Sequence, residues 1–254
     1  MNAAIVLCRR ELLRFVRQPT RILGSLAQPL LFWLFMGSGF AGSFAVAGGD
    51  QTYGEFFFPG IILMLLLFAA IFSTITLIED RAAGFLQGVL VAPVSRVGIV
   101  IGKLLGGAAI ALIQAGIFLA FAPFAGIALT PGIVLSLIAI CVVVALGFTG
   151  MGFFVAWCMD STAGYHAVMS VVFIPMWLLS GALFPLDGTA DWLGWIMIFN
   201  PVTYAMTAIR LAFYEPLGLL LGNERFLLAI GVSLGWTALT VIASVVVVRL
   251  RPAA

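Results

Sequence analysis

Residues 56–78 read FFFPGIILMLLLFAAIFSTITLI, and this stretch decides the fold class. It holds 23 residues without a charged side chain, between Glu55 and Glu79. An α-helix needs about 20 apolar residues to cross about 30 Å of hydrocarbon, whereas the strands of a membrane barrel are about ten residues long and alternate in polarity. The stretch therefore predicts a transmembrane helix.

Further charge-free runs lie on both sides of this stretch. They follow Arg21, Asp160 and Arg225, and the run after Lys103 is 56 residues long, which allows two crossings with a turn at residues 130–132 (Thr-Pro-Gly). We therefore expect an all-α, polytopic membrane protein that forms a single domain over residues 1–254. Its six predicted spans lie near residues 23–45, 57–78, 104–126, 133–156, 164–182 and 227–248.

The composition agrees with this class. The chain has 254 residues, of which 63% are hydrophobic and 9% are charged, whereas soluble domains carry about 25% charged residues. These values exclude an ordinary water-soluble enzyme and an intrinsically disordered chain. The three cysteines lack the spacing of a metal or redox motif. We therefore expect no metal, cofactor or nucleic-acid site in this chain.

The basic residues predict the orientation. Cytosolic flanks of membrane helices carry an excess of Lys and Arg, and the first side of a six-span chain would carry ten of the 12 basic residues. The ratio stays at ten to two if residues 192–209, a run of 18 residues without a charge, form a seventh span. The count therefore places the N-terminus in the cytosol but leaves the number of spans open.

Local chemistry in this last run favours six spans. Asn200 and Pro201 interrupt it, and a proline inside a helix removes a backbone hydrogen bond. Trp192 suits the headgroup level better than the bilayer centre, and Asp191 is placed to cap a short helix. We therefore predict that residues 183–209 form an extracellular re-entrant helical hairpin before the last span, so that both termini are cytosolic.

Residues 1–21 predict an amphipathic interfacial helix. Apolar residues recur on one helical face, at Ile5, Cys8, Leu12 and Phe15. Arginines recur on another face, at Arg10, Arg14, Arg17 and Arg21. Such a helix lies in the membrane plane with its arginines toward anionic headgroups. A bare basic flank would explain the arginines equally well but not the apolar register.

One pattern suggests catalysis but fails on its position. Residues 231–235 read GVSLG, the G-x-S-x-G form of serine hydrolases, which requires a strand-to-helix turn and a nearby histidine. Ser233 lies inside the last predicted span, at a different depth from the only histidine, His166. We interpret the two glycines as a helix-packing face, His166 as an interfacial residue, and Asp160 as the cap of the fifth span.

The sequence also indicates that the energy source lies outside this chain. Ion-coupled carriers usually place charged side chains at mid-membrane, and the interiors of the predicted spans contain none. The polar side chains there, which suit packing and a substrate path equally well, are Ser73, Thr74, Thr76 and Gln114. The single lysine is not in a P-loop. It lies instead in a stripe of small residues that allows close helix packing: Gly98, Gly102 and Gly106.

Residues 79–96 read EDRAAGFLQGVLVAPVSR and join the second and third predicted spans. The segment predicts a short cytosolic helix that Pro93 ends, after which Ser95 caps the next helix. Its apolar face comprises Phe85, Leu86, Val89 and Leu90. We expect these side chains to face water in the isolated chain, so that lipid or a partner protein has to cover them.

Several of these elements together resemble type-2 ABC exporter permeases. The short apolar helix followed by Ala-Pro-Val-Ser-Arg at 92–96 is similar to the coupling helix of that family. A Ser-Gly-x-x-Phe-Pro stretch over 180–185 and an Asn-Pro-x-x-Tyr element over 200–204 are similar to the region before its last span. The chain departs from the family at Gln87, where a glutamate is common, and at Phe85, where a small polar residue is usual.

The resemblance implies a function. It implies the permease subunit of an ATP-driven exporter in a bacterial plasma membrane, which pairs with a second copy of itself and binds two ATPase subunits that carry ATP and Mg. The aromatic content of the first two spans suits an apolar or amphipathic substrate such as a drug, a lipid or a lipid-linked glycan, although packing explains it as well. The alternatives are a gradient-driven carrier or channel that acts without an ATPase, and a membrane-embedded enzyme.

The resemblance also implies roles for particular residues. The ATPase-coupling residues would be Glu79, Arg81, Phe85, Leu86, Gln87, Leu90 and Arg96. The interfacial helix would transmit the motion through Arg10, Arg14 and Arg17. The outer gate would contain Phe184, Pro185, Asp191, Trp192, Asn200, Pro201 and Tyr204. The substrate path would include Phe32, Phe35, Phe57 and Thr74.

Overall fold

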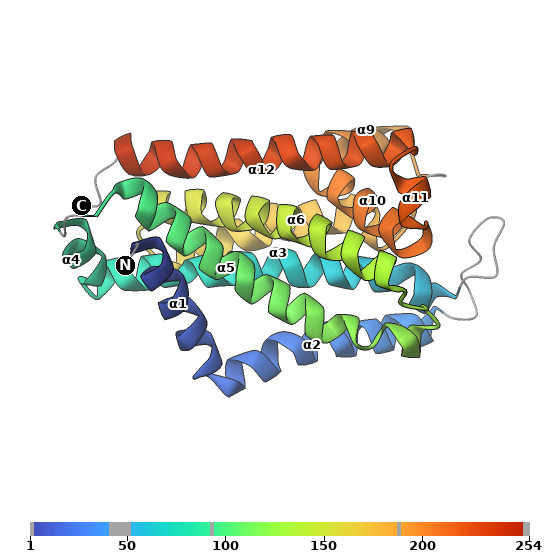
Figure 1. The fold of residues 1–254 in the computed structure, drawn as a ribbon, viewed down its shortest axis with the longest axis horizontal. Helices are drawn as coiled ribbons and strands as arrows, with labels where there is room; N and C mark the ends of the chain where they lie inside the picture. The colour runs from blue at the N-terminus through green and yellow to red at the C-terminus, as the bar shows by residue number, and fades with distance from the viewer. Residues whose placement is uncertain (1–2, 41–51, 92–93, 187–188, 251–254) are drawn as a thin grey trace.

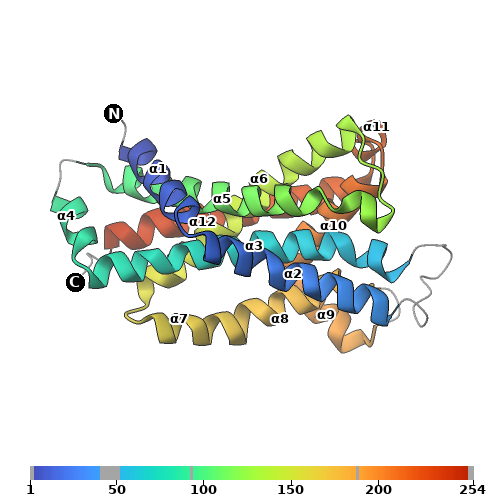
Figure 2. The ribbon, with the colours of Figure 1, turned by 90° about the horizontal axis from the view of Figure 1, so that it is seen from below.

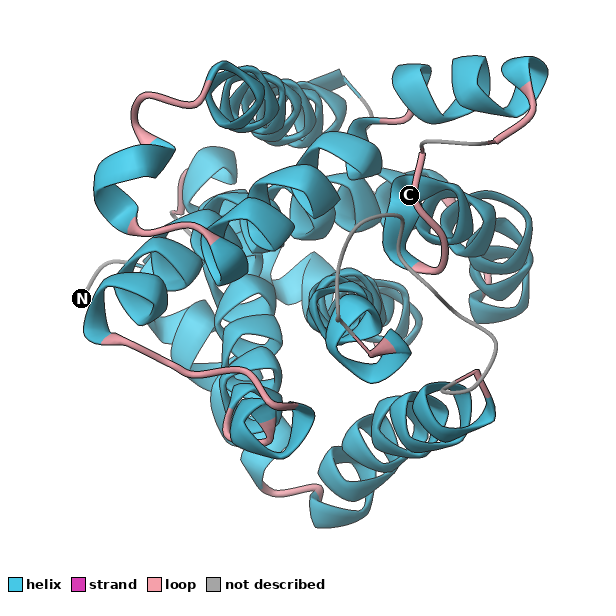
Figure 3. Cartoon of the chain, turned by 90° about the vertical axis from the view of Figure 1, so that its right-hand side faces the viewer, coloured by secondary structure: helices cyan, strands magenta, loops and turns pink. Residues whose placement is uncertain are grey.

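The computed structural model describes residues 3–40, 52–91, 94–186 and 189–250, apart from the side chains of Arg21 and Leu90, and every regular element in these ranges is a helix. The helices form an elongated bundle (Figure 1). A view along its long axis shows helices joined by loops (Figure 3). The all-α prediction is confirmed.

The described helices follow one another along the chain as α1 (Ala3–Val16), α2 (Pro19–Gly39), α3 (Tyr53–Ala82), α4 (Phe85–Val91), α5 (Arg96–Leu119), η1 (Ala122–Ala125), α6 (Pro131–Cys158), α7 (Thr162–Val168), η2 (Met169–Phe173), α8 (Ile174–Trp177), η3 (Leu178–Ala182), α9 (Asp191–Phe199), α10 (Pro201–Tyr214), α11 (Leu217–Leu220) and α12 (Glu224–Leu250). The segments α7 to η3 are continuous and act as one long helical run.

Six helical runs in the described ranges are long and apolar enough to cross a membrane, as predicted. Their bounds differ in places. The third span begins at Arg96 rather than at 104, because Ser95 caps it: the Gly98 N–H donates to the Ser95 hydroxyl at 3.1 Å. The first span ends at Gly39 in the described part, and the predicted residues 41–45 lie outside it.

The stretch that decides the fold class forms the centre of the bundle. Helix α3 packs against α2, α5 and α6, and Figure 2 shows it between these helices and the α7–α8 run. Its side chains are almost all buried, and several are completely so, among them Phe57, Ile61, Leu63 and Leu66. Burial on all sides explains why this stretch is apolar around its whole circumference.

The fifth span is irregular. Two π-helical segments, η2 and η3, interrupt it, and in η3 the backbone leaves the helical region at Leu179 and at Gly181, where φ is +83°. A left-handed φ favours glycine, which has no Cβ to clash. The irregular turns leave carbonyl groups without helical partners, and Thr203 and Arg210 of α10 donate to the carbonyls of Leu179 and Gly181, at 3.3 and 2.7 Å.

The predicted interruption at Asn200 is confirmed. Helices α9 and α10 meet there at an angle of 85°. The Val202 N–H donates to the Asn200 side chain at 3.0 Å, which caps α10, and Pro201 occupies the first helical position. Residues 192–209 are therefore two short helices rather than one straight helix.

The two ends of the described chain lie at the same end of the bundle. Figure 1 shows the start of α1, helix α4 and the last turn of α12 together. Arg96 at the start of α5 donates to the Val248 carbonyl near the end of α12 at 2.9 Å. An even number of crossings accounts for this arrangement.

Candidate functional site

Helix α1 lies directly against α5 because the facing side of α5 carries glycines. A Cβ on Gly102 would lie 2.8 Å from the Ala4 carbonyl oxygen, and one on Gly106 would lie 2.9 Å from the Glu11 Cβ. These two glycines therefore pack as predicted, while a Cβ on Gly98 would meet only the capping hydroxyl of Ser95. The close approach brings one face of α1 into the protein core.

The buried face of α1 agrees with the predicted one only in part. Phe15 is buried as predicted and Cys8 and Leu12 are half-buried, but Leu7 and Glu11 are also buried and Ile5 is 61% exposed. The apolar register predicted that Ile5 would be on the buried face. It did not predict that Glu11 would be there, because a buried Glu is costly unless it is paired. Glu11 is only 3% exposed, and its partners lie on the neighbouring helices α3 and α5.

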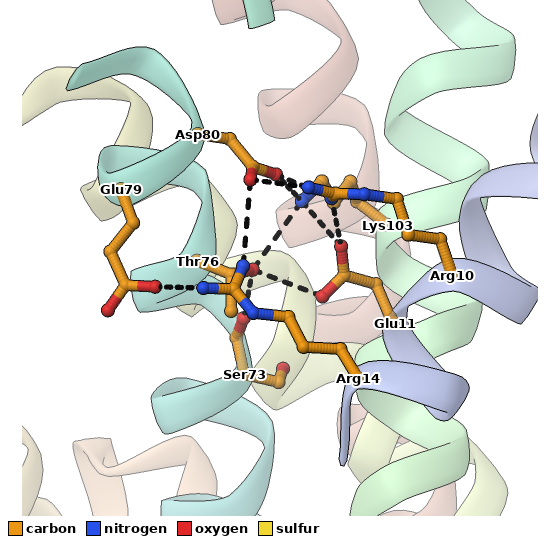
Figure 4. A network of polar contacts seen from close by, with 8 residues as sticks. All are labelled: Arg10, Glu11, Arg14, Ser73, Thr76, Glu79, Asp80 and Lys103. Carbon is orange, nitrogen blue, oxygen red and sulfur yellow. Dashed lines mark hydrogen bonds and ion pairs between the residues drawn. The ribbon is translucent and has the colours of Figure 1, made fainter. Parts of the chain in front are cut away.

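A buried ion cluster joins α1, α3 and α5, and Figure 4 shows it from close by. At its centre is Lys103, whose Nζ lies 2.7 Å from Glu11 Oε1 and 2.6 Å from Asp80 Oδ2. These three side chains are 3–6% exposed. The Thr76 hydroxyl also donates to Glu11, at 3.2 Å. Removing one partner from such a cluster leaves a buried charge uncompensated.

Two arginines of α1 complete this cluster. Arg10 binds both carboxylate oxygens of Asp80, at 2.8 and 2.9 Å, and approaches Glu11 at 3.2 Å. The hydrogen bond with Asp80 raises the pKa of Arg10 above its ordinary value, so this guanidinium stays charged. Arg14 pairs with Glu79 at 2.6 Å. We refer to Arg10, Glu11, Arg14, Glu79, Asp80 and Lys103 as the ion cluster.

The ion cluster corrects two predictions. Arg10 and Arg14 do not point toward lipid headgroups as expected, because acidic residues of α3 hold them, whereas Arg17 is exposed. From the sequence, Lys103 was predicted to flank the third span and Asp80 to lie in a cytosolic loop. Both lie inside regular helices. The pattern that would have indicated the cluster is an acidic residue on α1, Glu11, that shares the single lysine with Asp80 on α3.

Helix α4 confirms the predicted short helix between α3 and α5, and of its apolar face Phe85 is exposed as expected whereas Leu86 is not. Leu86 is 1% exposed and packs into the chain's own core, so the expectation that it faces water is wrong. Phe85 lies under the guanidinium of Arg10, with 3.9 Å from Cζ to the ring centroid. Val91 is 86% exposed and Gln87 is exposed. The Leu90 side chain lies outside the described part.

An open apolar groove runs between α1 and α4. Its volume is about 520 Å³, and its lining comes from both helices and the segment after them. The residues on its walls include Ala3, Val6, Leu7, Phe85, Val89 and Val94. Arg10 contributes to the same groove, so the charged cluster and this apolar surface share one side chain.

Two arginines predicted to face a partner bind helix ends of this chain instead. Arg81 donates to the carbonyls of Trp157 and Met159, at 2.9 and 3.1 Å, at the end of α6. Arg96 binds the end of α12 through the Val248 carbonyl. Cations at a helix C-terminus satisfy free carbonyls and favour the helix dipole. These arginines therefore tie the ends of long helices to α3 and α5.

A cavity of about 480 Å³ lies beside α3, with walls from α1, α2, α5 and the α7–α8 run. Its apolar lining includes Phe15, Met64, Phe68, Phe72, Met169 and Ile174. Its polar lining includes Glu11, Arg14, Ser73, Thr76, Gln114 and His166. The ion cluster therefore forms part of its wall.

The four predicted path residues do not line this cavity. Phe57 is fully buried and packs edge-on against Phe32, with 5.5 Å between ring centroids. Phe35 is 69% exposed on the outside of α2. Thr74 is buried, 2.7 Å from the Tyr165 hydroxyl. The aromatic residues were predicted from composition, which does not indicate the direction of a side chain.

At the other end of the bundle, α9 presents an apolar face to its surroundings. As its spacing predicts, Trp192, Trp195, Ile196 and Phe199 share one side, and each is at least 46% exposed. Asp191 is the first residue of α9 rather than its cap, a position that Ala190 occupies.

The remaining predicted gate residues lie close to this break. Asn200 donates to the Met176 carbonyl at 2.6 Å. Pro201 begins α10, and Tyr204 is half-buried. Phe184 and Pro185 are half-buried in the segment after η3. The structure thus brings together the end of the fifth span and the start of α10.

The structure corrects two further interpretations, that of the glycines in the last span and that of Asp160. A Cβ on Gly231 or Gly235 would meet no atom within 4 Å, so these glycines do not form a packing face within this chain. The Ser233 hydroxyl donates to the Ala229 carbonyl of its own helix at 2.8 Å. Ser161, not Asp160, caps α7. In the described ranges no group of three or more His, Cys, Asp or Glu side chains could hold a metal ion.

Comparison with known proteins agrees with this architecture. Residues 2–214 match the family model of the ABC-2 type transporter. The chain is 31% identical to a putative transport permease, ycf38, of Cyanophora paradoxa, over 81% of this chain and 72% of that protein. It is 28% identical to the ycf38 protein of Porphyra purpurea, over 80% and 71%.

A third relative comes from a bacterium. The chain is 27% identical to the probable doxorubicin resistance ABC transporter permease protein DrrC of Mycobacterium tuberculosis, over 79% of this chain and 73% of that protein. All three alignments cover most of both chains.

Proposed function

The chain belongs to the ABC-2 type transporter family, and on that premise we propose that it is the permease subunit of an exporter driven by a separate ATPase. In this proposal two copies of the chain pair in a bacterial plasma membrane, with both termini in the cytosol. Two ATPase subunits, which carry ATP and Mg, bind the face formed by α1 and α4. The multi-pass membrane character and the role of transport permease follow from the family and the six apolar helices.

The observation that carries the proposal is the contact of Arg10 with both α4 and the ion cluster. Arg10 covers the Phe85 ring and binds Asp80 of α3 through two hydrogen bonds. A displacement of α4 by a bound ATPase would therefore act on α3, the central helix, through a charged contact. Because Lys103, Glu11 and Asp80 are buried, the ion pairs among them are screened little by salt.

The groove between α1 and α4 supports an ATPase as the occupant of this surface. A short apolar groove next to exposed residues such as Gln87 and Val91 suits an interface with an apolar core and a polar rim. Burial of a few apolar side chains contributes about 1.5–3 kcal/mol each, against the cost of association. The residues Glu79, Arg81 and Arg96, bound within the chain, would act by positioning α4 and its neighbours.

We propose the cavity beside α3 as the substrate site, in place of the path through Phe32 and Phe57. Its size and mixed lining fit a drug-sized amphiphile, since ligand pockets are about 300–1,000 Å³ and mostly apolar. The relative named for doxorubicin resistance favours a drug over a lipid or a lipid-linked glycan.

We further propose that α9 and α10 form a re-entrant hairpin that acts as the outer gate. The 85° bend and the exposed tryptophans of α9 support a helix that dips into the outer leaflet. Cysteines at positions 189 and 222 should both react with an impermeant thiol reagent from outside. Protection of position 222 alone would mean that α9 and α10 together cross the membrane.

The ATPase interface is tested at Val91, whose exposed side chain takes no part in the chain's own core. We expect Val91→Asp to abolish ATPase association and ATP-driven transport in proteoliposomes, while the permease inserts and unfolds like the wild type. Leu221→Asp, a matched change at an exposed apolar residue that follows α11 at the opposite end of the bundle, should keep ATPase binding. Full transport by the permease alone, driven by a gradient, would contradict the proposal and favour a self-contained carrier.

A further inference from the structure

Gln114 is the buried polar residue of the cavity that has no partner of its own. It lies on α5, eleven residues beyond Lys103, or about 16 Å further along the helix axis. Its side chain is 97% buried, and in the described part of the chain no group forms a hydrogen bond with its amide. A buried amide without a hydrogen bond costs free energy. Polar groups deep inside a membrane protein generally mark a function.

The other buried polar residues of the cavity differ from Gln114 in this respect. The Ser73 hydroxyl donates to the Ala70 carbonyl at 2.6 Å, and the Thr76 hydroxyl has two acceptors in reach, the Ser73 carbonyl at 2.7 Å and Glu11 at 3.2 Å. Both hydroxyls therefore have acceptors within the protein. The Gln114 amide, which has two donors and one acceptor, is left to face whatever occupies the cavity.

The charges on the cavity wall are already neutralised by the protein. Glu11 is bound by Lys103, Arg10 and Thr76, and Arg14 is bound by Glu79. A charged ligand group would have to break one of these pairs or remain unpaired, and either alternative is costly in a buried site. The wall therefore favours an uncharged polar group beside Gln114.

The apolar part of the wall indicates the body of the ligand. Three phenylalanines and two methionines line it: Phe15, Phe68, Phe72, Met64 and Met169. Aromatic rings and polarisable thioethers contact flat aromatic surfaces favourably. The cavity follows α3 from Met64 to Thr76, which is about 18 Å along the helix.

From these observations we propose that the cavity binds an amphiphile whose flat, apolar body carries an uncharged hydroxyl or carbonyl group, and that Gln114 recognises this group by a hydrogen bond. The inference rests on the proposed function in that it names the class of substrate for the same cavity. It assigns Gln114 as the residue that determines specificity. The aromatic side chains cannot determine specificity alone, because apolar contact discriminates weakly between analogues that differ by a hydroxyl.

The test uses two matched probes on the full chain in lipid nanodiscs, without an ATPase. One probe is an aryl-diazirine amphiphile with a single ring hydroxyl, and the other lacks this hydroxyl. Photolabelled peptides are identified by mass spectrometry, and apparent affinities come from the concentration dependence of labelling on α3 and α5. We expect the wild type to label at the cavity and to prefer the hydroxyl probe by about tenfold.

Gln114→Leu should remove this preference and leave labelling by the probe without the hydroxyl unchanged. Ser233→Ala, which removes a buried hydroxyl of α12 that bonds only within its own helix, should keep the preference. Equal labelling of the wild type by both probes, or labelling outside the cavity, would overturn the proposal even if Gln114→Leu did not fold. Because no ATPase is present, this result is independent of whether the chain is an ATP-driven exporter.

Discussion

The two ends of the bundle differ in whether buried ion pairs hold them together. At the end where α1 and α4 lie, charged side chains bind one another, with Lys103 between two buried carboxylates, and Arg81 and Arg96 add contacts with helix-end carbonyls. At the opposite end, side chains donate to backbone carbonyls, as Asn200 does to Met176 and Arg210 to Gly181. We refer to these regions as the charged end and the carbonyl end.

The difference indicates how each end responds to a displacement. In the charged end Lys103, Glu11 and Asp80 are buried, and breaking one of their pairs would leave a buried charge uncompensated, so these three side chains are held together. In the carbonyl end the hydrogen bonds of Thr203 and Arg210 use acceptors in the irregular part of the fifth span. Such bonds can be exchanged one at a time. A rigid charged end and an adaptable carbonyl end suit a permease in which force enters at α4 and an outer gate opens.

The largest effect is expected from Lys103→Met, which leaves the carboxylates of Glu11 and Asp80 buried around the site of the missing charge. We expect the free energy of unfolding to fall by about 3–5 kcal/mol, the usual cost of breaking a buried ion pair from one side. Denaturant unfolding of the purified permease measures it.

A second variant distinguishes the loss of charge from the loss of packing at Lys103. Adding Glu11→Gln removes one of the two carboxylates, and Arg10 still holds Asp80. The double variant should therefore be more stable than Lys103→Met alone, with a coupling free energy of about 1 kcal/mol or more. If Lys103→Met unfolds within about 0.5 kcal/mol of the wild type, the charged end is not a cooperative unit.

A smaller effect is expected at the carbonyl end from Asn200→Ala. The change removes the cap of α10 and the hydrogen bond to the Met176 carbonyl. Together these losses should lower the free energy of unfolding by about 2 kcal/mol. Thr130→Ala, which removes the exposed cap of α6, is the matched control and should cost about 1 kcal/mol. An Asn200→Ala effect as large as that of Lys103→Met would erase the contrast between the two ends.

The carbonyl end was the more predictable of the two from the sequence. The break at Asn200-Pro201 follows from the fixed geometry of proline and the capping preference of asparagine, which are local properties. The exposed face of α9 follows from helical spacing alone. The number and approximate position of the spans follow from charge-free runs, which depend only on the thickness of the bilayer.

The charged end could not be derived in the same way. Glu11, Asp80 and Lys103 are far apart in the sequence, and only the packing of α1 on the glycines of α5 brings them together. Local rules treat each of them as a solvated flank. The same limit explains why Leu86, apolar on a short helix, was expected to face water, and why Gln114 was left equally open to packing and to a substrate path.

The smallest effect concerns Cys8, which lies on α1 beside the ion cluster. Burial raises the pKa of its thiol above the ordinary value, and the negative charge of Glu11 raises it further. A raised pKa leaves less thiolate at neutral pH, so alkylation should be slow there and should continue to accelerate as the pH rises past the ordinary thiol pKa. A variant that retains Cys8 and replaces Cys141 and Cys158 with serine reports this rate.

The reference for that rate is Ile5→Cys in a chain whose three native cysteines are serine, because position 5 is exposed on the same helix. Its alkylation should level off at a lower pH than that of Cys8. This difference reports first that the Cys8 face of α1 is buried and second that the charge of Glu11 lies beside it. Identical pH profiles would therefore mean that this face of α1 does not pack against the core, and the contrast between the charged end and the carbonyl end would lose its main cause.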